Sequence, residues 1–146
     1  MTLTELALGT ALVGSLAATA GNGIDTLAGD ARHAINQQLS ASITKTSELQ
    51  HLLNLHPSGS KSSIELTHRY PAANEAGIVN ALMLHLVNYE LASNEGYVRF
   101  FIPSAPRTGD CEVRYHQATS QSAARIELRS TPNACVHEAD TPQAET

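Results

Sequence analysis

The sequence predicts an α+β protein, in which a long N-terminal α-helix packs on a small antiparallel β-sheet head with one C-terminal disulfide loop. Three observations lead to this class. Between Met1 and His56 there is no proline, and apolar residues recur at helical spacing. The C-terminal half instead alternates apolar and polar residues with a period of two, which is typical of half-buried strands. Its two cysteines, Cys111 and Cys135, flank the last predicted pair of strands.

Length and composition limit the class of protein. The chain has 146 residues, enough for one domain with a modest core. Its net charge of -5 is mild and its hydrophobic content of 42% is ordinary, so it is neither a disordered acidic chain nor a globally basic nucleic-acid binder. With no tryptophan and 4% aromatic residues, a densely stacked aromatic surface is not expected.

The first segment, residues 1–24, carries a single charged residue, Glu5. A helix of this length spans roughly 35 Å, slightly more than the ~30 Å hydrocarbon core of a bilayer. Ala, Gly, Thr and Ser keep its hydropathy marginal, so a signal peptide and a buried core helix are alternatives to a membrane segment. A signal peptide needs a basic n-region, and no basic residue precedes Arg32. We therefore expect that an n-region has already been removed.

The second segment, residues 25–56, continues the helix with an amphipathic pattern. Its apolar stripe is formed by Ile24, Leu27, Ala31, Ile35, Leu39, Ile43, Thr46, Leu49 and Leu53. The patterns of residues 1–24 and 25–56 together predict one continuous helix of roughly 55 residues, about 80 Å long. A helix this long needs a partner along its length, which is a membrane, a coiled coil or a filament.

The third segment, residues 57–135, is the predicted head. Pro57–Ser60 ends the long helix, and the apolar spacing in Ala73–Ala92 predicts a second, mostly buried helix. Strands are expected at Tyr97–Ile102, Cys111–Thr119 and Ala123–Ser130. The last segment, residues 136–146, is polar without apolar periodicity, and we expect it to fray.

The predicted hairpin bears on the two cysteines. A turn at Ser120–Ser122 places Cys111 opposite Pro132, with Cys135 only three residues further on. A disulfide between them is sterically easy and closes a loop of roughly 25 residues, worth about 3 kcal/mol. Two free buried thiols in a cytosolic protein are the alternative, because disulfides persist mainly in exported proteins.

The opening residues resemble the mature N-terminus of type IV pilins and pseudopilins. That family begins with an apolar residue or Met, often followed by Thr or Ser, then Leu, with an acid at position five and Leu or Val at position six. The matching residues are Met1, Thr2, Leu3, Glu5 and Leu6. The run Leu12–Ala18 resembles the family's apolar stretch, with its Gly followed by Leu-Ala-Ala. Over the head the resemblance is one of architecture.

The resemblance implies how the chain is processed, where it is located and which partners it meets. A prepilin peptidase would remove a short leader and methylate Met1. The subunit would wait in the inner membrane with its head outside, until the pilus assembly machinery transfers it to an extracellular homopolymer on the bacterial surface. Met1 favours type IVb and the short chain favours type IVa, so both subclasses stay open. A pseudopilin of a type II-like secretion system and a membrane-anchored binding protein that never polymerises are the rival functions.

Glu5 and a glycine-rich stretch are the candidate assembly residues of the helix. The resemblance implies that Glu5 meets the N-terminal amine of a neighbouring subunit, whereas a first-turn acid favoured by the helix dipole is the structural alternative. Glycine weakens a helix by about 1 kcal/mol relative to alanine. Residues Gly14, Gly21, Asn22 and Gly23 therefore mark a segment that is expected either to melt in the filament or simply to tolerate its glycines.

No enzyme is predicted, and neither a cofactor nor a metal site is expected. Ser58–Lys61 fits S-x-x-K by its letters but lies in a turn-rich loop, and the seven histidines are scattered. One basic surface is a candidate binding face, formed on the predicted sheet by Arg99, Arg114, Arg125 and Arg129. A solvated face with Arg–Glu pairs is its ordinary interpretation, and weak binding of an anionic ligand such as DNA is its functional one.

Overall fold

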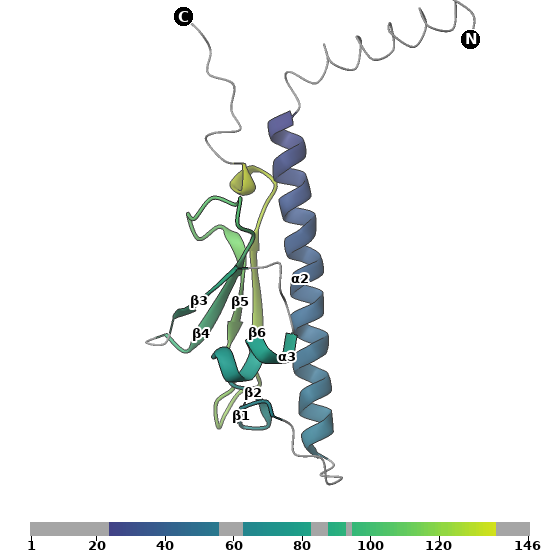
Figure 1. Cartoon of the computed structure of the whole chain (residues 1–146), viewed down its shortest axis with the longest axis vertical. Coiled ribbons are helices and arrows are strands. Elements are labelled where there is room, and N and C mark those ends of the chain that lie inside the picture. The colour runs from purple at the N-terminus through teal and green to yellow at the C-terminus, as the bar shows by residue number, and fades with distance from the viewer. Residues whose placement is uncertain (1–23, 56–62, 83–87, 93–94, 137–146) are drawn as a thin grey trace, which may run out of the picture.

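A single long helix runs the length of the head in the computed structural model, which describes residues 24–55, 63–82, 88–92 and 95–136 (Figure 1). This helix, α2 (Ile24–Leu55), lies against a four-stranded antiparallel sheet. The strands follow the order β3 (Asn88–Ala92), β4 (Tyr97–Phe101), β5 (Cys111–His116) and β6 (Arg125–Ser130). A separate two-stranded sheet joins β1 (Leu66–Thr67) to β2 (Tyr70–Pro71). The α+β class is thus confirmed.

The core lies between α2 and the sheet. Leu39 and Ile43 of the helix are buried there, and Ile78 joins them from the segment before β3. The sheet contributes Val98 and Phe100 from β4, and Val113 and Tyr115 from β5. These residues alternate along their strands with polar ones, as the period-two pattern predicted.

The predicted helix over Ala73–Ala92 is wrong in its second half. The structure has a short π-helical turn at Glu75–Val79 and three α-helical residues, α3 (Asn80–Leu82), whereas Asn88–Ala92 is strand β3. Gly77 has non-helical dihedral angles, because the backbone of Ala72 approaches so closely that a Cβ on Gly77 would lie 2.1 Å from its carbonyl oxygen. The helical spacing therefore covered two different elements.

A glycine at the turn before β4 explains why β3 is a strand. Gly96 has a φ of +67°, a left-handed conformation that favours glycine. The chain reverses there, and Ala92 pairs with Tyr97 at the first position of an antiparallel ladder. The ladder of β3 and β4 has five residue pairs in all, so backbone pairing outweighs the helical spacing of a few apolar side chains.

The three predicted strands of the C-terminal half are confirmed, with a correction to the register of the last hairpin. Cys111 pairs with Ser130 rather than Pro132. The connection is wider than the predicted turn at Ser120–Ser122, because regular pairing ends at His116 and Arg125. Within it, the hydroxyl of Thr119 accepts hydrogen bonds from the backbone N–H groups of Gln121 (3.2 Å) and Ser122 (3.1 Å).

The predicted disulfide between Cys111 and Cys135 is confirmed, with Cα atoms 5.1 Å apart. After β6 a 3-10 turn at Asn133–Cys135 bends the chain back over the end of the sheet, which compensates for the altered register. Both cysteines are buried in a small second core cluster with Ala105. The bond therefore fastens the end of the described chain to the first residue of β5.

Candidate assembly interface

The side of α2 that faces away from the sheet bears large, exposed apolar residues toward both ends of the helix. We call it the outer face, and its large residues are Leu27, Ile35, Leu49, Leu52 and Leu53, with 45 to 66% of each residue exposed. The predicted apolar stripe therefore divides in two. Leu39 and Ile43 enter the core, whereas most of the other large members of the stripe lie on the outer face. The helix has two apolar sides, and the head covers one of them.

Polar contacts fix which side of the helix the head covers. The side-chain amide of Asn36 donates to the hydroxyl of Ser130 at 3.1 Å and lies 3.4 Å from the sulfur of Cys111. About three turns further along α2, the hydroxyl of Ser47 lies 3.4 Å from that of Tyr115. Asn36 and Ser47 are buried, so a rotation of the helix would leave their polar groups without partners. The outer face is thereby held outward.

The C-terminal segment of the head is clamped to the first half of α2. The guanidinium of Arg32 donates to the carbonyl oxygen of Cys135 at 2.8 Å. Gly29 allows the close approach, because a Cβ at this position would lie 2.4 Å from the carbonyl oxygen of Pro132. The contact leaves the outer face untouched, since Gly29 and Arg32 lie on the side of the helix that bears the head.

The four arginines of the predicted anionic-ligand face do lie together, on the side of the sheet opposite α2. Each is within ion-pair distance of a carboxylate, and the pairs are Arg99 with Glu90 and Glu112, Arg114 with Glu112, Arg125 with Glu127, and Arg129 with Asp110 and Glu127. The Arg–Glu pairs expected for an ordinary solvated face are thus present in the fold. Binding of DNA by this face stays a prediction.

Glu112 is the centre of this charged face, and its burial was not predicted. Only 2% of its side chain is exposed, and Arg99 and Arg114 both bond to it. The hydrogen bond to Glu112 raises the pKa of Arg99 above its usual value. Nearby, the hydrogen bond from His116 lowers the pKa of Glu127, with an N–O distance of 2.9 Å. The arginines on neighbouring strands were the one available signal for a buried acid between them.

Most of the assembly residues predicted from the N-terminus lie outside the described residues. They are Met1, Thr2, Leu3, Glu5 and Leu6, together with Gly14, Gly21, Asn22 and Gly23. No helix within the described ranges is long and apolar enough to cross a membrane. Over the same ranges, no three His, Cys, Asp or Glu side chains gather in a way that could hold a metal ion.

Comparison with known proteins gives no relative. No protein-family model matches the chain, and neither a curated protein nor a solved structure matches it significantly. The class defined by the fold itself is a small α+β head on one long helix that exposes several large apolar residues on its far side.

Proposed function

We propose that this chain is a structural, non-enzymatic subunit of a type IV pilus-like extracellular filament that resides in the inner membrane before assembly. The outer face of α2 is the observation that carries the proposal. Five large aliphatic residues lie exposed along a helix of 32 residues, on the side that the head leaves free. They form two groups, Leu27 with Ile35 and Leu49 with Leu52 and Leu53, and exposed polar residues such as Gln38 and Lys45 lie between the groups. Clustered exposed apolar residues mark contacts with a protein partner or a membrane.

The proposed partner of the outer face is a second copy of the same helix. In sequence, residues 6–23, which precede α2, contain no charged residue. Small exposed residues, Ala31 and Ala34, lie among the large ones and permit close approach of helices. Full burial of an aliphatic side chain yields about 1.5–3 kcal/mol, so burying the exposed half of five contributes about 5 kcal/mol per helix.

The head is placed so that polymerisation does not disturb it. Its core and its disulfide lie on the opposite side of α2 from the outer face. Helices can therefore gather in the centre of a filament while the heads form its outer layer. Processing at Met1 by a prepilin peptidase, pairing of Glu5 with a neighbour's amine, and delivery by a pilus assembly machinery complete this proposal.

Substitutions on the outer face test the proposal. We expect the double variant Leu49→Gln/Leu53→Gln to lower filament yield at least about tenfold, because two apolar contacts per subunit become polar. Filaments would be counted by electron microscopy of cells that carry the assembly machinery. The amount of subunit in the membrane fraction and its disulfide, from non-reducing peptide mapping, would be measured on the same cultures.

The matched control replaces two exposed leucines of the head, Leu66→Gln/Leu128→Gln, which are 36% and 39% exposed. This variant makes the same chemical change outside the outer face and should leave the filament yield unchanged. Normal yield from the outer-face variant would contradict the proposal. A wild-type chain that stays monomeric in the membrane would support the rival binding protein, and only short periplasmic fibres would support the pseudopilin.

A further inference from the structure

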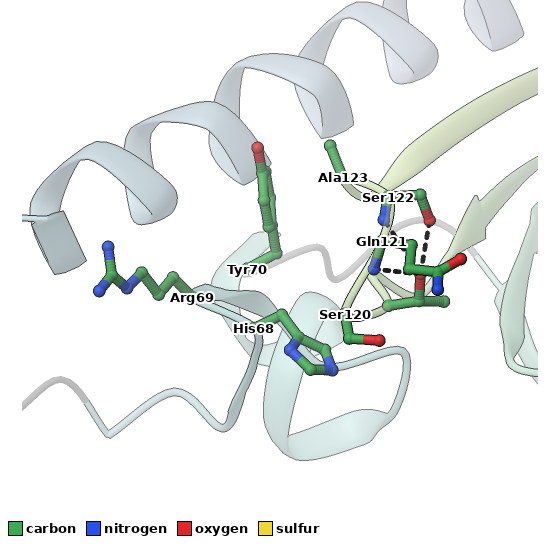
Figure 2. Close-up of a pocket in the computed structure, with 8 residues that line it drawn as sticks. His68, Arg69, Tyr70, Ser120, Gln121, Ser122 and Ala123 are labelled. Carbon is green, nitrogen blue, oxygen red and sulfur yellow. Dashed lines mark hydrogen bonds between the residues drawn. The ribbon is translucent and has the colours of Figure 1, made fainter.

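Strand β6 lies at one edge of the four-stranded sheet, and β5 is its single neighbour in that sheet among the described residues. The connection that leads into β6 is fixed by the hydroxyl of Thr119, and Figure 2 shows its bonds to the backbone N–H groups of Gln121 and Ser122. An edge strand presents backbone N–H and C=O groups that can pair with a strand of another molecule. The filament proposal does not use this edge.

The sequence of β6 lacks the features that usually protect an edge strand. Arg125–Ser130 contains no proline, glycine or lysine, and its pairing with β5 runs over six consecutive residues without a bulge. The side chains on the side of α2 are Ile126, Leu128 and Ser130, none of which is charged. The strand is therefore long and regular enough to accept a further strand.

A hollow of about 480 Å³ lies along the second half of β6. Its lining consists of four consecutive residues of the strand and three residues near them: Glu127, Leu128, Arg129, Ser130, Thr131, Ala134 and Asp110. Leu128 is 39% exposed here, whereas Ile126, two residues earlier on the same side, packs against the core. An added strand at this place would cover the exposed part of Leu128.

The charges on the outward side of β6 fit a second copy of the same strand. Arg125, Glu127 and Arg129 alternate in sign on this side. In an antiparallel pair of two β6 strands centred on Leu128, Glu127 of each copy lies opposite Arg129 of the other. Opposite charges at facing positions stabilise a pair of strands.

Other registers of the same two strands fit less well. Centring the pair on Glu127 would set Arg125 opposite Arg129 and Glu127 opposite itself, and like charges at facing positions are destabilising. Centring it on Ile126 would match the charges but would leave Leu128 opposite the small side chain of Ala124. The charges and the exposed leucine together favour the register centred on Leu128.

The other edge strand of the sheet, β3, does not have this self-complementarity. Its one charged residue is Glu90, so no basic residue of a second β3 could lie opposite that carboxylate. The edge that suits a second copy of the chain is therefore that of β6.

We infer that two heads join through antiparallel pairing of their β6 strands, centred on Leu128, so that two four-stranded sheets become one. Two Glu127–Arg129 pairs form on the outward side, and Leu128 contacts its own copy on the side of α2. A two-fold axis relates the two heads. Subunits of a helical filament all point the same way, so this contact joins separate filaments or unassembled subunits. None of its residues belongs to the outer face.

Cysteine cross-linking of the full chain, purified in detergent, tests the inference. Residues that face each other across an antiparallel pair lie close enough for a disulfide, so Leu128→Cys should link to its own copy when copper–phenanthroline oxidises the two thiols. The control is Leu66→Cys, at a leucine of similar exposure on β1. We expect at least about tenfold more cross-linked dimer from Leu128→Cys. Equal yields, or no dimer from Leu128→Cys, would overturn the inference.

Charge reversal separates pairing from folding. Added to Leu128→Cys, either Glu127→Arg or Arg129→Glu sets like charges at facing positions and should lower the dimer yield at least about tenfold. A mixture of the two reversed chains restores opposite charges and should cross-link like the parent, a recovery that two misfolded heads could not show. Arg107→Glu, at an arginine that is 68% exposed elsewhere on the head, is the control and should not change the yield. Undiminished cross-linking of the reversed chains, or a mixture that stays monomeric, would contradict the inference.

Discussion

The side-chain amide nitrogen of Asn36 lies 3.4 Å from the sulfur of Cys111, so the long helix contacts the disulfide of the head directly. Asn36 is fully buried, and its nitrogen also donates to the hydroxyl of Ser130 on β6. One polar side chain thus joins the helix, the first residue of β5 and the last residue of β6. The contact between the helix and the head is polar at Asn36 and apolar further along the helix, at Leu39 and Ile43.

Asn36→Ala should destabilise the head. The substitution removes one partner of the Ser130 hydroxyl, which also lies 3.1 Å from Nδ1 of His33, and opens space beside the disulfide. Loss of a buried hydrogen bond costs about 1–3 kcal/mol. Urea unfolding followed by circular dichroism would measure the change. Gln38→Ala, two residues away on the exposed side of α2, is the matched control and should change the free energy of unfolding by less than about 0.5 kcal/mol. Equal effects of the two substitutions would show that Asn36 plays no special part.

Glu112→Gln should be more damaging than its conservative chemistry suggests. It would leave Arg99 and Arg114 facing each other over a neutral amide, at a site where Glu112 is almost completely buried. Breaking a buried ion pair costs about 3–5 kcal/mol, and we expect about 2–3 because both guanidinium groups keep some contact with water. Glu90→Gln removes an exposed partner of Arg99 and should change stability by less than about 1 kcal/mol. The prediction fails if both variants unfold at the same urea concentration.

The buried phenol of Tyr115 should make the head sensitive to alkali. Burial raises the pKa of Tyr115 from about 10 to about 12, and its hydroxyl donates to the carbonyl oxygen of Pro71 at 2.8 Å. Since the folded state holds this proton more tightly, the stabilisation is complete below the unfolded pKa of about 10 and is lost as the pH rises through about 12.

Tyr115→Phe should therefore have two effects. At neutral pH the variant loses about 1 kcal/mol, because the Pro71 carbonyl no longer has this donor. Above about pH 10 its stability should decline less steeply than that of the wild type. The free energy of unfolding in urea would be measured for both chains from about pH 8 to about pH 11. Parallel curves across this interval would rule out a contribution from the Tyr115 proton.

Glu5→Val should prevent efficient filament assembly while the head stays folded. The variant makes the first segment more apolar, so the subunit should remain in the membrane fraction. Valine cannot neutralise the N-terminal amine of a neighbour as that amine enters a dry filament core, and the register between subunits is no longer specified. Glu5→Asp keeps the charge with a shorter reach and should be milder. Filament yield and membrane-bound subunit would be measured side by side, and normal yield from Glu5→Val would reduce Glu5 to an acid favoured by the helix dipole.

Local patterns predicted most of the described elements. The helix to Leu55 follows from its apolar spacing, and β4, β5 and β6 follow from strict alternation. Strand β3 was missed because Asn88–Ala92 depends on its partner β4, and a pairing partner cannot be read from a segment alone. The Gly96 turn was the available signal.

The candidate interface shows a different limit of the sequence. The apolar stripe identified the helix but not which residues face the head, because Asn36 and Ser47 are buried while Leu27 and Leu53 are exposed. Hydrogen bonds to particular groups of the sheet decide this, and they appear only once β5 and β6 are in register. The free edge of β6 was not predicted either, because the pattern of a single strand does not show whether one or both of its edges are paired.

The link between Cys111 and Cys135 also governs how the head would respond to a protease. The turn at Ser120–Ser122 is exposed and lies inside the covalent loop closed by the disulfide. A cut there would break the peptide chain between β5 and β6 without separating the fragments. The nicked head would keep its mass on a non-reducing gel and would yield two fragments only after a thiol is added. The nicked head would remain attached to α2, and only the turn between β5 and β6 would be cut.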